Sequence, residues 1–159
     1  MERGGIDRAI KIKKEFGVSV DSLKSDKRVQ EAAVKEIIDC LGGGDIDSAI
    51  VKAKAIRDEF GVSEERAQEA AKEVIISRLR WGDIDRAIVK AKAIRDEFGV
   101  SDERVQEAAV KGIIYYLGRG DNVKAEAIRD KFSVSKEKLQ EIKTGSEEIK
   151  KTYRNGRVS

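Results

Sequence analysis

A segment of 38 residues occurs twice in succession, and this duplication constrains the fold of the chain more than any other feature. Residues 44–81 and 82–119 are identical at 28 of 38 aligned positions. Diverged copies flank them in residues 1–43 and 120–153, each about one helical turn shorter in its first helix. A repeat period of about 20 to 50 residues is the signature of proteins that stack one supersecondary unit on the next. We therefore predict four stacked units, followed by a basic tail at 154–159.

Each copy has the sequence pattern of two helices joined by a glycine turn. In residues 44–81, Asp45 suits the N-cap, and apolar residues follow at helical spacing as far as Phe60. Gly61 suits the left-handed position after the first helix, and Ser63 suits the N-cap of the second. We predict turns near Gly61, Gly82, Gly99 and Gly120, and buried side chains for Phe60 and Phe98.

The second helix of the second copy is apolar over about half of its circumference, as expected for an inner helix with neighbours on two sides. In residues 44–81 its stripe consists of Ala67, Ala70, Ala71, Val74 and Ile75. The fourth copy has Lys143, Glu147, Glu148 and Lys151 where the third has Ala109, Ile113, Ile114 and Leu117. A terminal repeat needs such a polar outer face. We therefore expect residues 120–153 to cap an all-α fold, a short right-handed α-solenoid of about four helix-turn-helix repeats.

The composition indicates a solvated helical surface. Charged residues make up 40% of the chain, the net charge is only +3, and proline is absent. No stretch approaches the ~18 apolar residues of a membrane span, and the first residues lack a secretory apolar region. A single cysteine suits a reducing compartment, so we expect a cytoplasmic protein. The abundance of Glu and Lys is also typical of thermophilic proteins.

Nothing in the sequence predicts an active site. Histidine, the commonest general base and metal ligand, is absent. The thiol of Cys40 falls on the apolar side of its helix, so we expect it to be buried and inert. The paired aspartates Asp45/Asp47 and Asp83/Asp85 lack the rest of a calcium loop and are better explained as helix caps. We expect no enzyme, cofactor, metal or small-molecule substrate.

Two segments resemble tetratricopeptide repeats. The sequence GDIDRAIVKAKAI at residues 82–94 is similar to the second helix of that repeat, with its Gly-Asp opening and its Ala87-Ile88 pair. The sequence IIYYLGRGD at residues 113–121 is similar to the end of the first helix. This resemblance implies a superhelix of helical hairpins that binds partner proteins.

An arginine recurs in the first helix of three copies, as Arg57, Arg95 and Arg129. On an ideal helix each falls within the apolar arc. One interpretation is structural, with the stem packed along the hairpin and the guanidinium paired with a helix-capping carboxylate. The other is a ladder of guanidinium groups along one groove, suited to acidic peptides or phosphates.

The copies differ most at the end of the second helix. These positions hold Arg80 and Trp81 in the second copy and Tyr115, Tyr116 and Arg119 in the third. Helical spacing predicts that Trp81 and Tyr116 face the core and that Tyr115 and Arg80 face outward. Core filling is one explanation of the aromatic residues, and a protein interface or stacking platform is the other.

All of the net positive charge lies in residues 120–159, and the tail contributes Arg154 and Arg157. Our leading hypothesis is a non-catalytic scaffold or adaptor that binds a protein partner. The alternative is a nucleic-acid-binding protein that uses the basic tail and the arginine ladder. The residues expected to contact a partner are Arg57, Arg80, Trp81, Arg95, Tyr115, Arg119, Arg129, Arg154 and Arg157.

Overall fold

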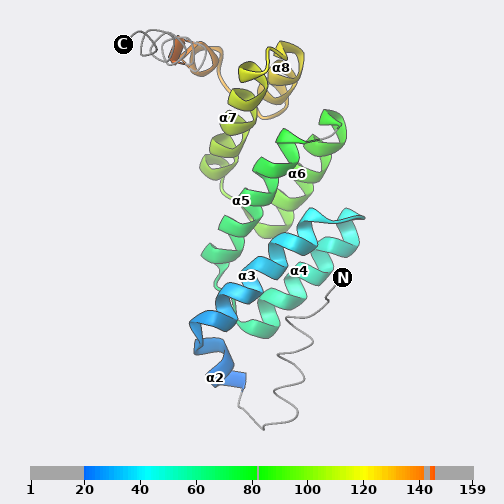
Figure 1. Ribbon diagram of the computed structural model, residues 1–159, viewed down its shortest axis with the longest axis vertical. Coiled ribbons are helices and arrows are strands. Elements are labelled where there is room, and N and C mark those ends of the chain that lie inside the picture. Colours follow the sequence, from blue (N-terminus) through cyan, green and yellow to red (C-terminus); the bar gives the residue numbers. More distant parts are fainter. Residues whose placement is uncertain (1–19, 82, 142–143, 146–159) are drawn as a thin grey trace, which may run out of the picture. The chain divides into compact units, whose positions relative to one another are not determined.

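The computed structural model describes residues 20–81, 83–141 and 144–145, and all regular structure in these residues is α-helical. Helices cover 84% of them. The labelled helices are α2 (Val20–Ser25), α3 (Lys27–Gly42), α4 (Ile46–Phe60), α5 (Glu64–Arg80), α6 (Ile84–Phe98), α7 (Asp102–Gly118) and α8 (Asn122–Lys131). Residues 136–141 and 144–145 are also helical. The prediction of an all-helical fold is confirmed for this part of the chain (Figure 1).

The chain forms two compact units, which are described separately. The first contains residues 20–74 and 92–100, and the second contains residues 75–91 and 101–145 within the described ranges. Helices α5 and α6 each begin in one unit and end in the other.

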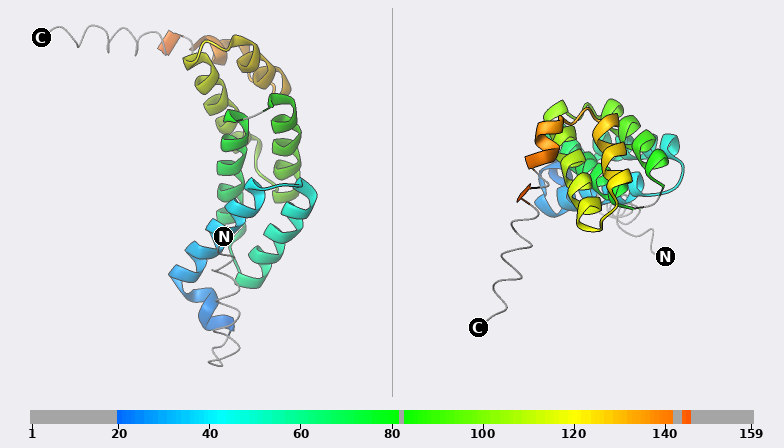
Figure 2. Two further views of the ribbon diagram at one scale, coloured as in Figure 1. Left: turned by 45° about the vertical axis from the view of Figure 1, so that its right-hand side comes forward. Right: turned by 90° about the horizontal axis from the view of Figure 1, so that it is seen from above.

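In the first unit, α3 packs against α4, and the two helices lie side by side in all views (Figure 1 and Figure 2). Near the start of α3, the Gln30 side-chain amide donates a hydrogen bond of 2.6 Å to the main-chain carbonyl of Phe60 at the end of α4. The amide also donates to the Lys24 carbonyl at 2.9 Å. Because these carbonyls lie at helix ends without intrahelical partners, the buried glutamine stabilises both ends.

The second unit repeats this arrangement with α7 and α8. Gln106 donates to the main-chain carbonyl of Phe132 at 2.6 Å, as Gln30 does to Phe60. A Cβ atom placed on Gly112 of α7 would lie 3.1 Å from the Leu79 Cβ and 3.2 Å from the Ile128 Cδ1. The absence of a side chain at Gly112 therefore lets α7 pack closely against these two residues.

These contacting helix pairs are offset by one helix from the repeats as counted from Gly44. The pair α3 and α4 joins the second helix of one copy to the first helix of the next, across residues 43–45. The pair α7 and α8 does the same across residues 119–121. The connection within a copy, residues 61–63, is equally short.

The predicted helix signals are present in the structure. The Ser48 amide donates to the Asp45 carboxylate at 3.0 Å, so Asp45 is an N-cap. Gly61 has a φ of 60°, and the Val62 amide donates to the Arg57 carbonyl at 2.9 Å, which completes a Schellman turn. Gly99 and Gly120 also have positive φ values, whereas Gly82 lies outside the described residues.

The core consists of the apolar faces predicted from the spacing. Phe60 and Phe98 are buried, as predicted, and so is the alanine-rich stripe of α5. The side chain of Ile114 is 46% exposed, whereas neighbouring Ile113 is fully buried. Successive helical residues are about 100° apart, so burying the face that contains Ile113 leaves Ile114 at its edge.

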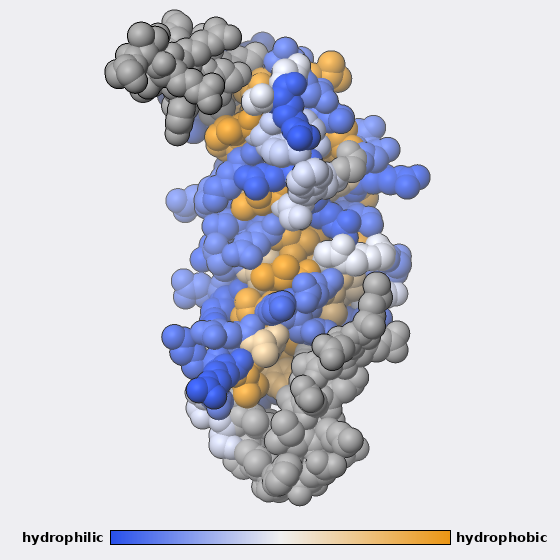
Figure 3. Space-filling view, viewed as in Figure 1, coloured by the Kyte–Doolittle hydropathy of each residue, from blue (hydrophilic) through white to orange (hydrophobic). Residues whose placement is uncertain are grey.

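The polar residues predicted to face outward from the C-terminal cap, Lys143, Glu147, Glu148 and Lys151, lie outside the described residues, as does the basic tail. The same holds for the first helix of the first copy. In the visible face, hydrophilic side chains cover most of the surface and hydrophobic ones lie among them (Figure 3). No helix in the described residues combines the length and apolar character that crossing a membrane requires.

Candidate functional site

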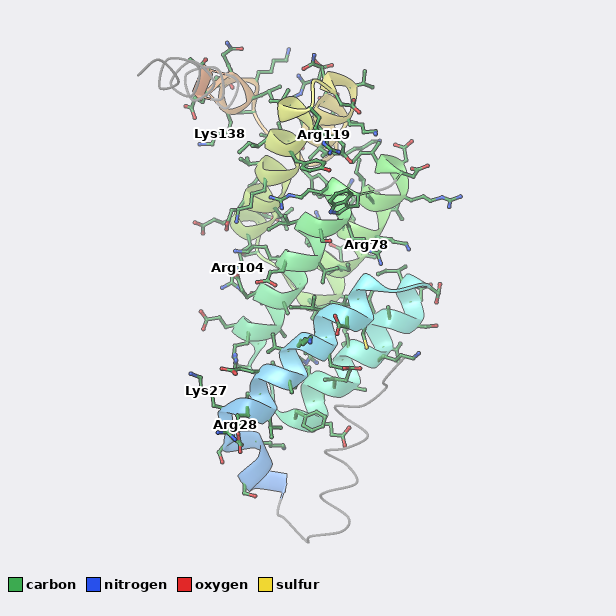
Figure 4. All side chains as sticks on the ribbon, in the orientation of Figure 1. Lys27, Arg28, Arg78, Arg104, Arg119 and Lys138 are labelled. Atoms are coloured by element: carbon green, nitrogen blue, oxygen red, sulfur yellow. The ribbon has the colours of Figure 1, made fainter. Side chains whose placement is uncertain are left out.

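Four of the predicted partner-binding residues meet in the second unit. The Tyr115 ring lies 5.6 Å from the Trp81 ring, centroid to centroid, with an interplanar angle of 55°. The guanidinium carbons of Arg119 and Arg80 lie 4.9 Å and 6.0 Å from the Tyr115 centroid. We call Arg80, Trp81, Tyr115 and Arg119 the Tyr115 cluster. Arg119 is labelled in Figure 4, together with Arg78 from the last turn of α5.

The ends of α5 and α7 position the cluster. Helix α5 ends at Arg80, so Trp81 is the first residue beyond it, and α7 ends at Gly118, just before Arg119. The prediction that Trp81 faces the core is wrong, since its side chain is 64% exposed. The backbone leaves the helix at this point, so the helical spacing used for that prediction no longer applies.

Tyr116 supports the cluster from the core side. Its side chain is buried, as predicted, and its ring packs edge-on against Tyr115 at 5.3 Å. The Lys124 ammonium lies 5.2 Å from the Tyr116 centroid and forms an ion pair with Asp121 at 3.3 Å. Burial raises the pKa of the Tyr116 hydroxyl above its usual value.

Two polar atoms of the Tyr115 cluster are buried without a hydrogen-bond partner in the part of the chain that the structure describes. They are the Nε of Arg80 and the hydroxyl oxygen of Tyr115. An unsatisfied buried polar group typically costs about 1–3 kcal/mol. Both groups are donors, so an added acceptor would stabilise them.

The recurring arginines Arg57, Arg95 and Arg129 each form an ion pair with the aspartate that follows directly in the sequence. The Nε to Oδ1 distances are 2.8, 2.7 and 2.8 Å. Their side chains are only 28%, 33% and 19% exposed. The partner is therefore the next residue in the same helix, and not a helix-capping carboxylate.

In each ion pair the aspartate offsets the positive charge of the arginine. The hydrogen bond from Arg57 holds the pKa of Asp58 below its usual value, so this aspartate stays ionised beside the guanidinium. Arg57 and Arg95 belong to the first unit and Arg129 to the second. Arg154 and Arg157 lie outside the described residues.

Cys40 is half-buried, so its predicted burial is only partial. Desolvation, and then the negative charge of Glu36, raises the pKa of its thiol, which favours the unreactive protonated form. Within the described ranges, no group of three or more Cys, Asp or Glu side chains is arranged to hold a metal ion.

The sequence analysis did not identify the glutamines that bind helix-end carbonyls, Gln30 and Gln106, or the contact of Lys124 with Tyr116. A signal for the former was present, because Gln30, Gln68 and Gln106 recur at the repeat period of 38 residues. Lys124 gave no such signal, since it contacts Tyr116 only through the packing of α8 on α7.

The Tyr115 cluster thus combines an exposed indole, a phenol and two guanidinium groups, which suits recognition and offers no nucleophile or general base at neutral pH.

Comparison with protein-family models, curated proteins and solved structures finds no match to this chain.

Proposed function

We propose that this protein is a non-catalytic scaffold or adaptor, built as a short right-handed α-solenoid of helical repeats, that binds a partner protein through the Tyr115 cluster. The observation that carries the proposal is the exposure of Trp81, 64%, directly beside Tyr115 and two arginines. Tryptophan, tyrosine and arginine dominate the binding energy of protein interfaces. A tryptophan left mostly in water loses hydrophobic stabilisation that contact with a partner would restore.

The repeat comparison supports the same conclusion. The second and third copies are identical at 28 of 38 positions, and four of the ten differences lie in the last five residues, where the second has Ser77 in place of Tyr115. The third has Arg119 in place of Trp81. Residues needed for stacking are expected to recur in each copy, so residues unique to one junction suit a role outside the repeat scaffold. A cytoplasmic location remains our expectation.

The experiment is affinity capture from an extract of the native source, followed by reconstitution with the purified partner. Wild-type protein is compared with Trp81→Ala and with Val51→Ala, which removes an equally exposed apolar side chain, 69%, from the other unit. We expect Trp81→Ala to weaken binding at least tenfold and Val51→Ala to leave the dissociation constant unchanged. Equal loss in both variants, or in neither, would contradict docking at the Tyr115 cluster.

The alternative is a nucleic-acid-binding protein, favoured by one observation. An exposed tryptophan flanked by arginines also resembles the platforms on which unpaired bases stack. This hypothesis predicts binding that weakens steeply with salt, because phosphate contacts release counterions. Absence of binding to single-stranded and duplex DNA and RNA at ~50 mM salt would refute it.

A further inference from the structure

We propose that the Tyr115 cluster recognises an acidic segment of the partner protein, with carboxylates bound by Arg80 and Arg119 and an adjacent apolar side chain packed on Trp81. This inference rests on the proposed function and adds the chemical class of the ligand. It also implies a single site in the described chain, since no other pair of helix ends there carries this combination of residues.

The charge around the cluster favours an anionic ligand. Residues 77–81 and 115–120 contain no aspartate or glutamate, and Asp83 and Asp121 are the next acidic residues in the sequence. In the first copy the corresponding segment, residues 39–43, begins with Asp39 and has no basic residue. The basic character is therefore a property of this junction, and it has no counterpart in the preceding one.

Stabilisation of the helix dipole alone does not explain why an arginine occupies position 80. Basic residues in the last turn of a helix stabilise the helix dipole, and Arg78 and Arg80 occupy the last turn of α5. The equivalent turn of α7 has no basic residue, and it holds Tyr116 and Gly118 at these positions. Helix α7 therefore forms without a basic residue in its last turn, which points to another role for Arg80 in α5.

The unpartnered donors indicate what the ligand supplies. The Nε of Arg80 and the hydroxyl of Tyr115 are buried without an acceptor among the described residues. A carboxylate offers two oxygen acceptors and binds guanidinium groups through paired hydrogen bonds. A small rearrangement that admits a carboxylate oxygen to either group would satisfy that donor.

A short acidic segment fits better than a nucleic acid. Asp83 and Asp85, both exposed, lie within four residues of Trp81 in the sequence. Lys124 is already paired with Asp121. A nucleic acid carries a phosphate on each nucleotide and requires several phosphate contacts for affinity, so these aspartates oppose it. A segment that carries only a few carboxylates meets less of this repulsion than a phosphate backbone does.

Trp81 is the only tryptophan in the chain, so its fluorescence reports directly on the cluster. The probes are an octapeptide of alternating glutamate and glycine, the same peptide with glutamine, and an eight-nucleotide oligothymidylate. We expect saturable change of the emission with the glutamate peptide, and at least a fivefold weaker response with the glutamine peptide. The double variant Arg80→Gln/Arg119→Gln should lose this response, whereas Arg66→Gln, exposed in the first turn of α5, should retain it.

Other outcomes overturn the inference in distinguishable ways. If neither peptide changes the emission while the captured partner still requires Trp81, the acidic ligand is wrong and the proposed function stands. If the oligothymidylate alone binds, the acidic ligand is wrong and the nucleic-acid alternative replaces the proposed function. If the double variant binds the glutamate peptide as well as wild type does, the assignment to Arg80 and Arg119 is wrong.

Discussion

Ser133 provides a direct test of how helix ends are stabilised in this fold. It has a φ of 54° and is the only residue other than glycine with a positive φ in the described part of the chain. Gly61 and Gly99 occupy the same position after the first helix of their copies, with φ values of 60° and 59°. Each of the three sites is followed by a valine whose amide donates to an arginine carbonyl five residues earlier.

Ser133→Gly should therefore stabilise the protein. The left-handed conformation costs an L-residue about 1–2 kcal/mol. Glycine removes this cost but gains about 0.4–1 kcal/mol of conformational freedom in the unfolded chain. The Ser133 side chain is exposed, so little contact is lost. The net increase in the free energy of unfolding is about 0.5–1 kcal/mol, or about 1–4 °C in Tm for a chain of this size.

The matched controls separate backbone strain from side-chain effects. Ser133→Ala keeps the Cβ atom and should leave Tm unchanged. Gly99→Ala should lower stability by about 1 kcal/mol through the backbone alone, because its Cβ would make only ordinary contacts, at 3.8 Å from the Gln68 Nε2. Thermal unfolding followed by circular dichroism measures all three variants. A Ser133→Gly variant less stable than Ser133→Ala would refute the reasoning.

Three further predictions concern the core and the cysteine. Phe98→Ala should lower the free energy of unfolding by about 3–5 kcal/mol in urea denaturation, because the side chain is only 3% exposed; a loss below ~1 kcal/mol would contradict its burial. Gly112→Val introduces the residue that the second copy has at this position, and it should lower the free energy of unfolding by at least about 1–3 kcal/mol, because its Cβ would crowd Leu79. An unchanged free energy of unfolding would show that the helices move apart to accommodate the side chain. The Cys40 thiol should react with a disulfide reagent at pH 8 more slowly in the native protein than in urea, because its raised pKa lowers the thiolate fraction; equal rates would contradict this.

The local elements of the fold follow from sequence because local chemistry specifies them. A side-chain oxygen before a helix bonds to its first amides, which identifies Asp45, and only certain residues adopt a left-handed turn, which identifies Gly61 and Gly99. Their spacing, together with the apolar stripes, predicts the helices to within a few residues. Residue type does not predict the left-handed turn at Ser133, because its backbone follows the repeat although a serine side chain disfavours that conformation.

The features that sequence reasoning missed depend on contacts between helices. Gly112 looks like an unfavourable helix residue until Leu79 and Ile128 are seen to occupy its side-chain space. The glutamine at position 106 acts on a carbonyl 26 residues away. Helical spacing assigns a direction to a residue only while the helix continues, which is why the exposure of Trp81 was mispredicted.

The candidate site was predictable in membership but not in geometry. The concentration of differences at the end of the second helix singled out Arg80, Trp81, Tyr115 and Arg119, and the structure brings these four together. The recurring arginines were equally visible in the sequence. Their pairing with the following aspartate depends on side-chain conformation, which repeat spacing does not specify.

The central claim, that a partner protein docks on the Tyr115 cluster, is tested most directly by ¹⁹F NMR of protein labelled with 5-fluorotryptophan. Trp81 is the single tryptophan, so the spectrum contains one protein resonance. The purified partner, unlabelled, is added until size-exclusion chromatography shows complete complex formation. Our account predicts that the resonance shifts or broadens in the complex. Its chemical shift should also no longer differ between H₂O and D₂O, because the exposed ring leaves water. An unchanged resonance in a fully formed complex would place the interface elsewhere and contradict the claim.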